Sequence, residues 1–169
     1  MDAKGYIQRQ VASVRRTSDA VTGDLQEEQL GWTPPGTANP IGATLLHAVH
    51  SEDAFVRRTI QGQATTFDSG AWAEKLGVAA EPGKGPSWEG MKGKPLSLAQ
   101  VLDYQNVVRA ETDAYLAGLT PEELDRQVMT FRGEMPVGAV LALYLGHQAH
   151  HFGEIAALKG AQGAKGLPF

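Results

Sequence analysis

Apolar residues recur at steps of three and four in four long stretches of the chain, the spacing that places them on one face of an α-helix. These stretches are residues 2–21, 40–60, 97–116 and 136–160. The sequence shows no internal repeat and no convincing strand, so the pattern predicts an all-α fold. Four helices of this length predict a four-helix bundle, and the long connection between the second and third leaves room for a crossover.

Local signals mark the ends of these helices. Asn39 followed by Pro40 predicts a helix start, because asparagine caps free amides and proline suits the first helical position. Residues 97–100 have the form of a capping box, and residues 120–123 predict a short helical turn by the same logic. Residues 127–131 are interpreted as an extended connector without a pairing partner.

Two connections differ in composition from the helices. Residues 25–39 contain prolines and glycines and predict a crossing segment that packs Leu30 and Trp32 onto the bundle. Residues 62–95 are rich in Gly, Pro and Lys, with a short helical turn predicted at 70–77. A loop this long is either functional or mobile, and one hypothesis for its role is a lid over a pocket at one end of the bundle.

Composition limits the classes of function. The 169 residues, 42% of them hydrophobic, predict one domain spanning residues 1–169. The net charge of −4, with Lys and Arg dispersed, argues against nucleic acid or an anionic membrane as a partner. There is no cysteine, so any metal must be held by histidine, carboxylate and water. Without an apolar signal segment or a run of about 18 apolar residues, we expect a cytoplasmic protein.

The last predicted helix carries two histidines on its apolar face. His147 and His151 continue the stripe of apolar residues, whereas His150 points elsewhere. Residues four apart lie one turn apart on a helix, so the two imidazoles can converge on one point, and this spacing is common in metal sites. The alternative is that each ring is a core histidine with a hydrogen-bond partner on a neighbouring helix.

The second predicted helix carries His47 and His50, and its periodicity does not choose between them. His47 lies away from the main apolar direction, on a second face with small side chains. Glu52 is a candidate carboxylate to orient a metal ligand, or else a satisfied polar residue. The adjacent Arg57 and Arg58 either face solvent or contact an anionic substrate.

Two segments, LLHAVHSEDAFV and GHQAHHFGEIAALKGAQGAKGLPF, resemble the signature helices of the DinB/YfiT-like family of metalloenzymes. In that family one histidine of the second helix and two histidines four apart on the last helix bind a divalent metal, usually zinc or nickel. The resemblance therefore implies His47, His147 and His151 as metal ligands and favours His47 over His50. Some relatives place a glutamate where this chain has His147. The family also implies a DinB-like helical bundle and a homodimer.

The resemblance implies a function as well, because the family includes thiol S-transferases that use bacillithiol or mycothiol. Three imidazoles without a thiolate leave at least one metal position open for water or substrate. We therefore expect a metal-activated low-molecular-weight thiol, as cosubstrate, to attack a small electrophile. The alternatives are a metal-dependent hydrolase with the same ligands, and a non-catalytic helical binding protein whose histidines are merely buried.

Overall fold

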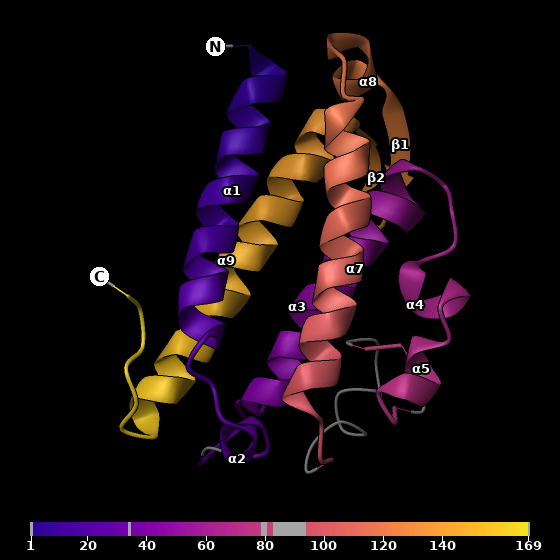
Figure 1. Cartoon of the computed structure of the whole chain (residues 1–169). Helices are drawn as coiled ribbons and strands as arrows, with labels where there is room; N and C mark the ends of the chain where they lie inside the picture. The colour runs from indigo at the N-terminus through magenta and orange to yellow at the C-terminus, as the bar shows by residue number, and fades with distance from the viewer. Residues whose placement is uncertain (1, 34, 79–80, 83–93, 169) are drawn as a thin grey trace.

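The structure is a computed structural model that describes residues 2–33, 35–78, 81–82 and 94–168. Its long helices form a bundle (Figure 1), which confirms the all-α prediction. Helix α3 continues without a break into the π-helix η1, and together they form the second long element. The bounds of these elements are α1 (Ala3–Thr22), α3 (Ile41–Asp53), η1 (Ala54–Ile60), α7 (Leu98–Ala117) and α9 (Val137–Ala161).

Shorter elements connect the long helices. Helix α2 follows α1, while α4 and α5 follow η1, and α8 follows α7. The predicted turns at 70–77 and 120–123 correspond to α5 and α8 and are confirmed. The bounds are α2 (Glu27–Leu30), α4 (Thr66–Ser69), α5 (Trp72–Lys75) and α8 (Pro121–Asp125).

A β-hairpin corrects the prediction for residues 127–131. Strand β1 (Gln127–Thr130) pairs antiparallel with β2 (Gly133–Pro136), and Thr130 lies opposite Gly133. The turn between them needs Gly133, whose φ of 97° is costly for residues with a side chain. The prediction was wrong because β2 ends in a proline and shows no alternation of apolar and polar residues, so its sequence gives little strand signal.

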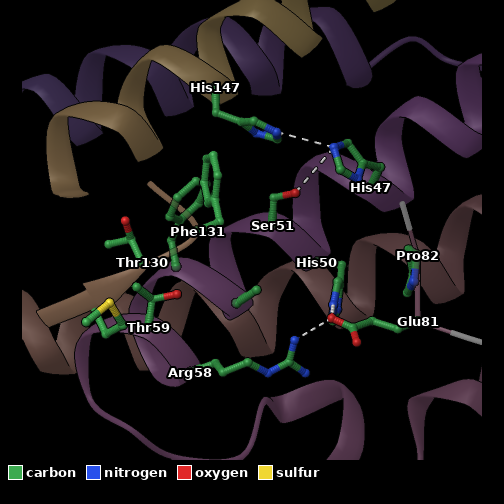
Figure 2. A pocket seen from close by; sticks show the side chains of 13 residues that line it. His47, His50, Ser51, Arg58, Thr59, Glu81, Pro82, Thr130, Phe131 and His147 are labelled. Carbon is green, nitrogen blue, oxygen red and sulfur yellow. Dashed lines mark hydrogen bonds and ion pairs between the residues drawn. The ribbon is translucent and has the colours of Figure 1, made fainter. Parts of the chain in front are cut away.

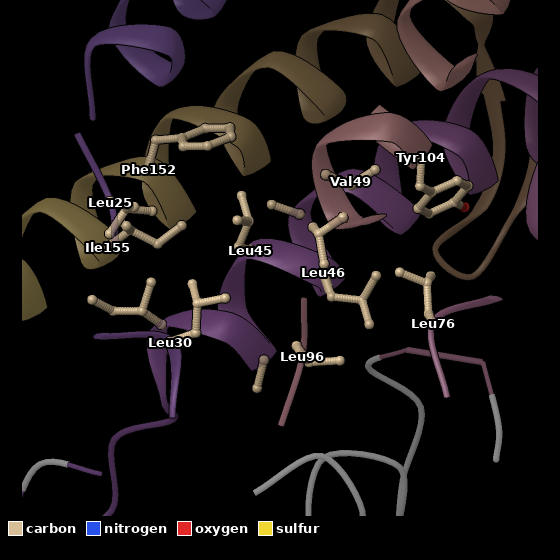
Figure 3. Close-up of a cluster of buried hydrophobic side chains, with 14 of the residues drawn as sticks. Leu25, Leu30, Leu45, Leu46, Val49, Leu76, Leu96, Tyr104, Phe152 and Ile155 are labelled. Atoms are coloured by element: carbon tan, nitrogen blue, oxygen red, sulfur yellow. The ribbon is translucent and has the colours of Figure 1, made fainter. Parts of the chain in front are cut away.

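Helix α3 lies between α9 and α7, and α1 packs on α9 (Figure 1). The larger core cluster lies where α3 meets the lower half of α9, and Leu45 and Ile155 are fully buried in it (Figure 3). Leu30 is buried in the same cluster and Trp32 packs against it, as predicted. A second cluster surrounds the first turns of α9 and includes Tyr144.

Two of the predicted helix caps differ from the structure. Helix α3 begins at Ile41, and Pro40 stands in an extended conformation at the cap position without a side-chain cap. Ser97 stands at the cap position of α7 and makes no side-chain capping hydrogen bond. The amide of Leu98, the first residue of α7, donates to Glu27 Oε1 of α2 at 3.1 Å, so a tertiary contact satisfies this free amide. No helix in the described part of the chain is long and apolar enough to cross a membrane.

Candidate metal centre

Three histidine side chains converge where α3 packs against α9. His47 comes from α3, and His147 and His151 come from successive turns of α9. The Nε2 atom of His147 lies 3.2 Å from Nε2 of His47 and 3.2 Å from Nε2 of His151. One ring nitrogen from each of the three residues lies within 4.8 Å of those of the other two. The structure thus brings together the three residues that the resemblance implied.

The spacing of these nitrogens fits a divalent metal. Zinc binds histidine nitrogen at about 2.0–2.1 Å, so two ligands of a tetrahedral ion lie about 3.3 Å apart. The two 3.2 Å separations are close to that value. If Nε2 of His147 carries a proton, it can donate to only one of the two neighbouring Nε2 atoms, so at least one nitrogen lone pair in the cluster has no hydrogen-bond donor. A bound cation would satisfy the lone pairs of all three nitrogens.

Neighbouring groups fix how two of the rings are oriented. The Nδ1 atom of His151 lies 3.1 Å from Glu154 Oε2. An ionised carboxylate only accepts hydrogen bonds, so Nδ1–H donates and the Nε2 lone pair is left facing the other rings. The ring of His47 forms a hydrogen bond with the backbone of Pro82. A proline backbone has no N–H, so here the imidazole is the donor and the carbonyl accepts.

The environment keeps His47 and His147 neutral, which is the form that binds metals. Burial lowers the pKa of His47 to about 3, with smaller contributions from the nearby His151 and His147 because like charges repel. Burial likewise lowers the pKa of His147 to about 4, again with a contribution from His151. At neutral pH both rings therefore offer lone pairs rather than positive charge.

The centre opens onto a cavity of about 500 Å³. Figure 2 shows His47 and His147 at one end of it and Arg58 with Glu81 at the other. The wall between them comes from three regions of the chain: α3 with η1, residues 81–82, and the β-hairpin. The remaining lining residues are His50, Ser51, Ala54, Phe55, Thr59, Pro82, Met129, Thr130 and Phe131.

His50 lies in the cavity wall but is not part of the three-histidine cluster. Its Nδ1 lies 3.1 Å from Tyr104 Oη, and Tyr104 donates to Asp53 Oδ2 at 2.7 Å. Because Tyr104 gives its proton to Asp53, it accepts one from His50. The other ring nitrogen lies 2.7 Å from Glu81 Oε1. Both nitrogens of His50 are thus engaged, and the geometry selects His47 instead.

The other candidate residues have separate partners. Glu52 pairs with Arg15 at 3.0 Å, so the carboxylate that orients a histidine of the cluster is Glu154 and not Glu52. Arg57 pairs with Glu111, whereas Arg58 reaches the cavity wall and bonds to Glu81 and Asp68. His150 is exposed, as predicted.

Sequence reasoning missed several residues of the site. Glu154 follows His151 by three positions on α9, so helical spacing could have found it. Glu81 and Phe131 carry no such signal, because each reaches the cavity from a connection whose path depends on tertiary packing. The hypothesis of a lid formed by residues 62–95 falls partly on residues 79–80 and 83–93, which lie outside the described part of the chain.

Comparison with known proteins gives the family. The family description that matches is the DinB superfamily, over residues 10–155. The chain belongs to the DinB superfamily. A comparison with curated proteins found no match.

Solved structures share the DinB fold with this chain. A conserved protein from Enterococcus faecalis superposes with a TM-score of 0.79 at 13% identity, covering 94% of this chain and 96% of the other. A DinB-like protein from Bacillus subtilis gives a TM-score of 0.64 at 18% identity, covering 97% and 96%. A DinB-like protein from Bacillus cereus gives 0.63 at 17%, covering 96% and 95%. At these identities the likeness establishes the fold alone.

The lowered pKa values predict that the metal-free protein loses stability in mild acid. Below pH 6.5 the unfolded chain protonates His47 and His147, whereas the folded state resists until about pH 4. The free energy of unfolding should therefore fall between pH 6.5 and 5, by at most about 1.4 kcal/mol per pH unit for each ring. Urea titrations should show a shallower fall in His147→Gln, and an unchanged fall in the control His150→Gln. Equal pH profiles in all three proteins would contradict this.

The hydroxyl of Tyr104 should contribute to stability as well. Tyr104→Phe leaves buried His50 without its Nδ1 partner and removes one donor from Asp53. We expect a loss of about 1–3 kcal/mol in the free energy of unfolding. The matched control is Tyr115→Phe, whose hydroxyl donates to Glu123 at 2.8 Å in a half-buried position where water can replace it. Equal losses in the two variants would show that burial of the hydrogen bonds among His50, Tyr104 and Asp53 adds nothing to the free energy of unfolding.

Proposed function

We propose that this protein is a metal-dependent enzyme that activates a low-molecular-weight thiol for attack on a small electrophile. The observation that supports the proposal is the convergence of three histidine ring nitrogens next to a cavity that His47 and His147 line. His47, His147 and His151 would hold the ion, and zinc or nickel suits neutral imidazoles without thiolates. A catalytic site needs an open metal position, and the cavity leaves room for one beside His47 and His147.

In the proposed reaction the bound ion and the side chains of the site would have different roles. A bound divalent ion would supply Lewis acidity, lowering the pKa of a thiol or of water at the open position. Glu154 holds His151 with its Nε2 lone pair inward, and the Pro82 carbonyl anchors His47. In the transfer the thiol sulfur forms a bond to carbon, the leaving group departs with its electron pair, and the thiol proton passes to solvent.

The alternative from the same ligands is hydrolysis, in which water takes the place of the thiol. The three-histidine geometry suits both reactions equally, and the family resemblance favours the thiol. The resemblance and composition also lead us to propose a homodimer with a small-molecule substrate in the cytoplasm. Sedimentation of the purified protein tests the dimer.

Metal content is the first measurement. Protein purified without a nickel column should hold about one zinc, nickel or similar ion per chain by elemental analysis. His47→Ala, His147→Ala and His151→Ala should each lose most of it, because two remaining imidazoles bind far more weakly. The matched control is His150→Ala, which removes an exposed histidine from the same helix and should keep the ion. If the protein held no metal and took up none on titration, the metal site would be wrong and the three histidines would be ordinary buried residues of a helical bundle.

Activity separates the two reactions. Metal-loaded protein should consume 1-chloro-2,4-dinitrobenzene with bacillithiol, mycothiol or glutathione, and the metal-free protein should lose this turnover. His151→Ala should lose activity together with its metal, whereas His150→Ala should not. Hydrolysis of nitrophenyl esters without added thiol would favour the hydrolase instead. A metal-loaded protein without turnover in either assay would support the non-catalytic alternative.

A further inference from the structure

The cavity beside the three histidines has an apolar mouth. Met129 and Phe131 come from the hairpin, and their side chains are 72% and 79% exposed although both line the cavity. Figure 2 shows Phe131 between the hairpin and the histidine end of the cavity. Phe55 also lines the cavity, and its ring lies 5.7 Å from that of His147. An apolar ligand next to His147 would therefore remove several apolar surfaces from water at once.

The charged groups of the described cavity wall already neutralise one another. Arg58 bonds to Glu81 and, at 3.1 Å, to Asp68. Glu81 also bonds to His50. A charged ligand would have to replace one of these pairs, and burying an unpaired charge is costly. An uncharged ligand leaves all of them in place.

We propose that this cavity binds the uncharged aliphatic or aromatic body of the electrophilic substrate, with its reacting end at His47 and His147. The apolar body lies against Phe55 and the exposed side chains of Met129 and Phe131, which all line the cavity. A volume of about 500 Å³ falls in the range of small-molecule sites. The placement of the reacting end rests on the proposed function, whereas the apolar subsite stands on the cavity itself.

A homologous series of ligands tests the apolar subsite. Butane-, pentane- and hexane-1-thiol carry a head group for a metal and bodies that differ by one methylene. Calorimetric titration of the zinc-loaded protein should show affinity rising about three- to fourfold per methylene, the gain from burying one CH₂. The control ligand 5-mercaptopentanoate places a carboxylate where hexanethiol has an apolar end, and it should bind more than about tenfold more weakly. Affinity independent of chain length, or tighter binding of the carboxylate, would overturn the proposal.

Phe131→Ser tests the position of the subsite. The side chain is 79% exposed, so its removal should leave the melting temperature nearly unchanged while reducing the gain per methylene to less than about twofold. The matched control is Tyr6→Ser on α1, an aromatic residue 53% exposed and outside the cavity lining, which should keep the full gain. If Phe131→Ser changes only the oligomeric state and not the thiol affinities, a second copy of the chain covers this surface and the proposal fails.

Titrations of the metal-free protein test the apolar subsite independently of the proposed metal-dependent function. Butan-1-ol to hexan-1-ol, which need no metal, should show the same gain per methylene in metal-free protein. If the protein binds no metal but the alcohols show that gain, the proposed function fails and the apolar subsite stands. If the protein binds metal but neither series depends on chain length, the apolar subsite fails and the proposed function stands.

Discussion

The packing of α3 against α9 is the contact on which the candidate site depends. Leu45 and Ile155 are fully buried in the larger core, and each lies within a few positions of a histidine of the cluster. The two helices are therefore held together by apolar burial close to the site, and the histidines need not supply the energy for their own approach. The approach brings the three rings together while burial keeps His47 and His147 neutral, which is the combination that a metal ligand requires.

Most of the helical architecture and the shared face of His147 and His151 could be predicted from the sequence. Helical periodicity predicted the long helices, and the four-residue spacing of His147 and His151 predicted that their rings share one face. The choice of His47 over His50 came from a family resemblance, because both lie on buried faces of one helix. The structure gives a physical reason: His50 is already engaged by Tyr104 and Glu81, which lie far away in the sequence.

The π-helix changes the periodicity of the second long element after Asp53. Residues Ala54–Ile60 form a π-helix, in which an amide pairs with the carbonyl five residues back, and the amide of Gln61 donates to the carbonyl of Val56 in this way. A turn with an extra residue rotates all later side chains relative to an ideal α-helix. Phe55 and Arg58 enter the cavity through this wider turn. A helical wheel with 100° steps therefore could not place these two side chains. Phe131 was not predicted for a different reason, because the hairpin sequence lacks the alternation of apolar and polar residues that indicates strands.

Residues 81 and 82 touch both parts of the site, since Glu81 bonds to His50 and the Pro82 carbonyl accepts from His47. This short segment thus interacts with the histidine cluster and with the far end of the cavity, and its stability depends on both contacts. Ligands at two sites that order the same segment strengthen each other's binding by equal factors. A metal and a cavity ligand would therefore be coupled thermodynamically through this segment as well as through any contact between them, and a mutation at Glu81 would change both affinities together.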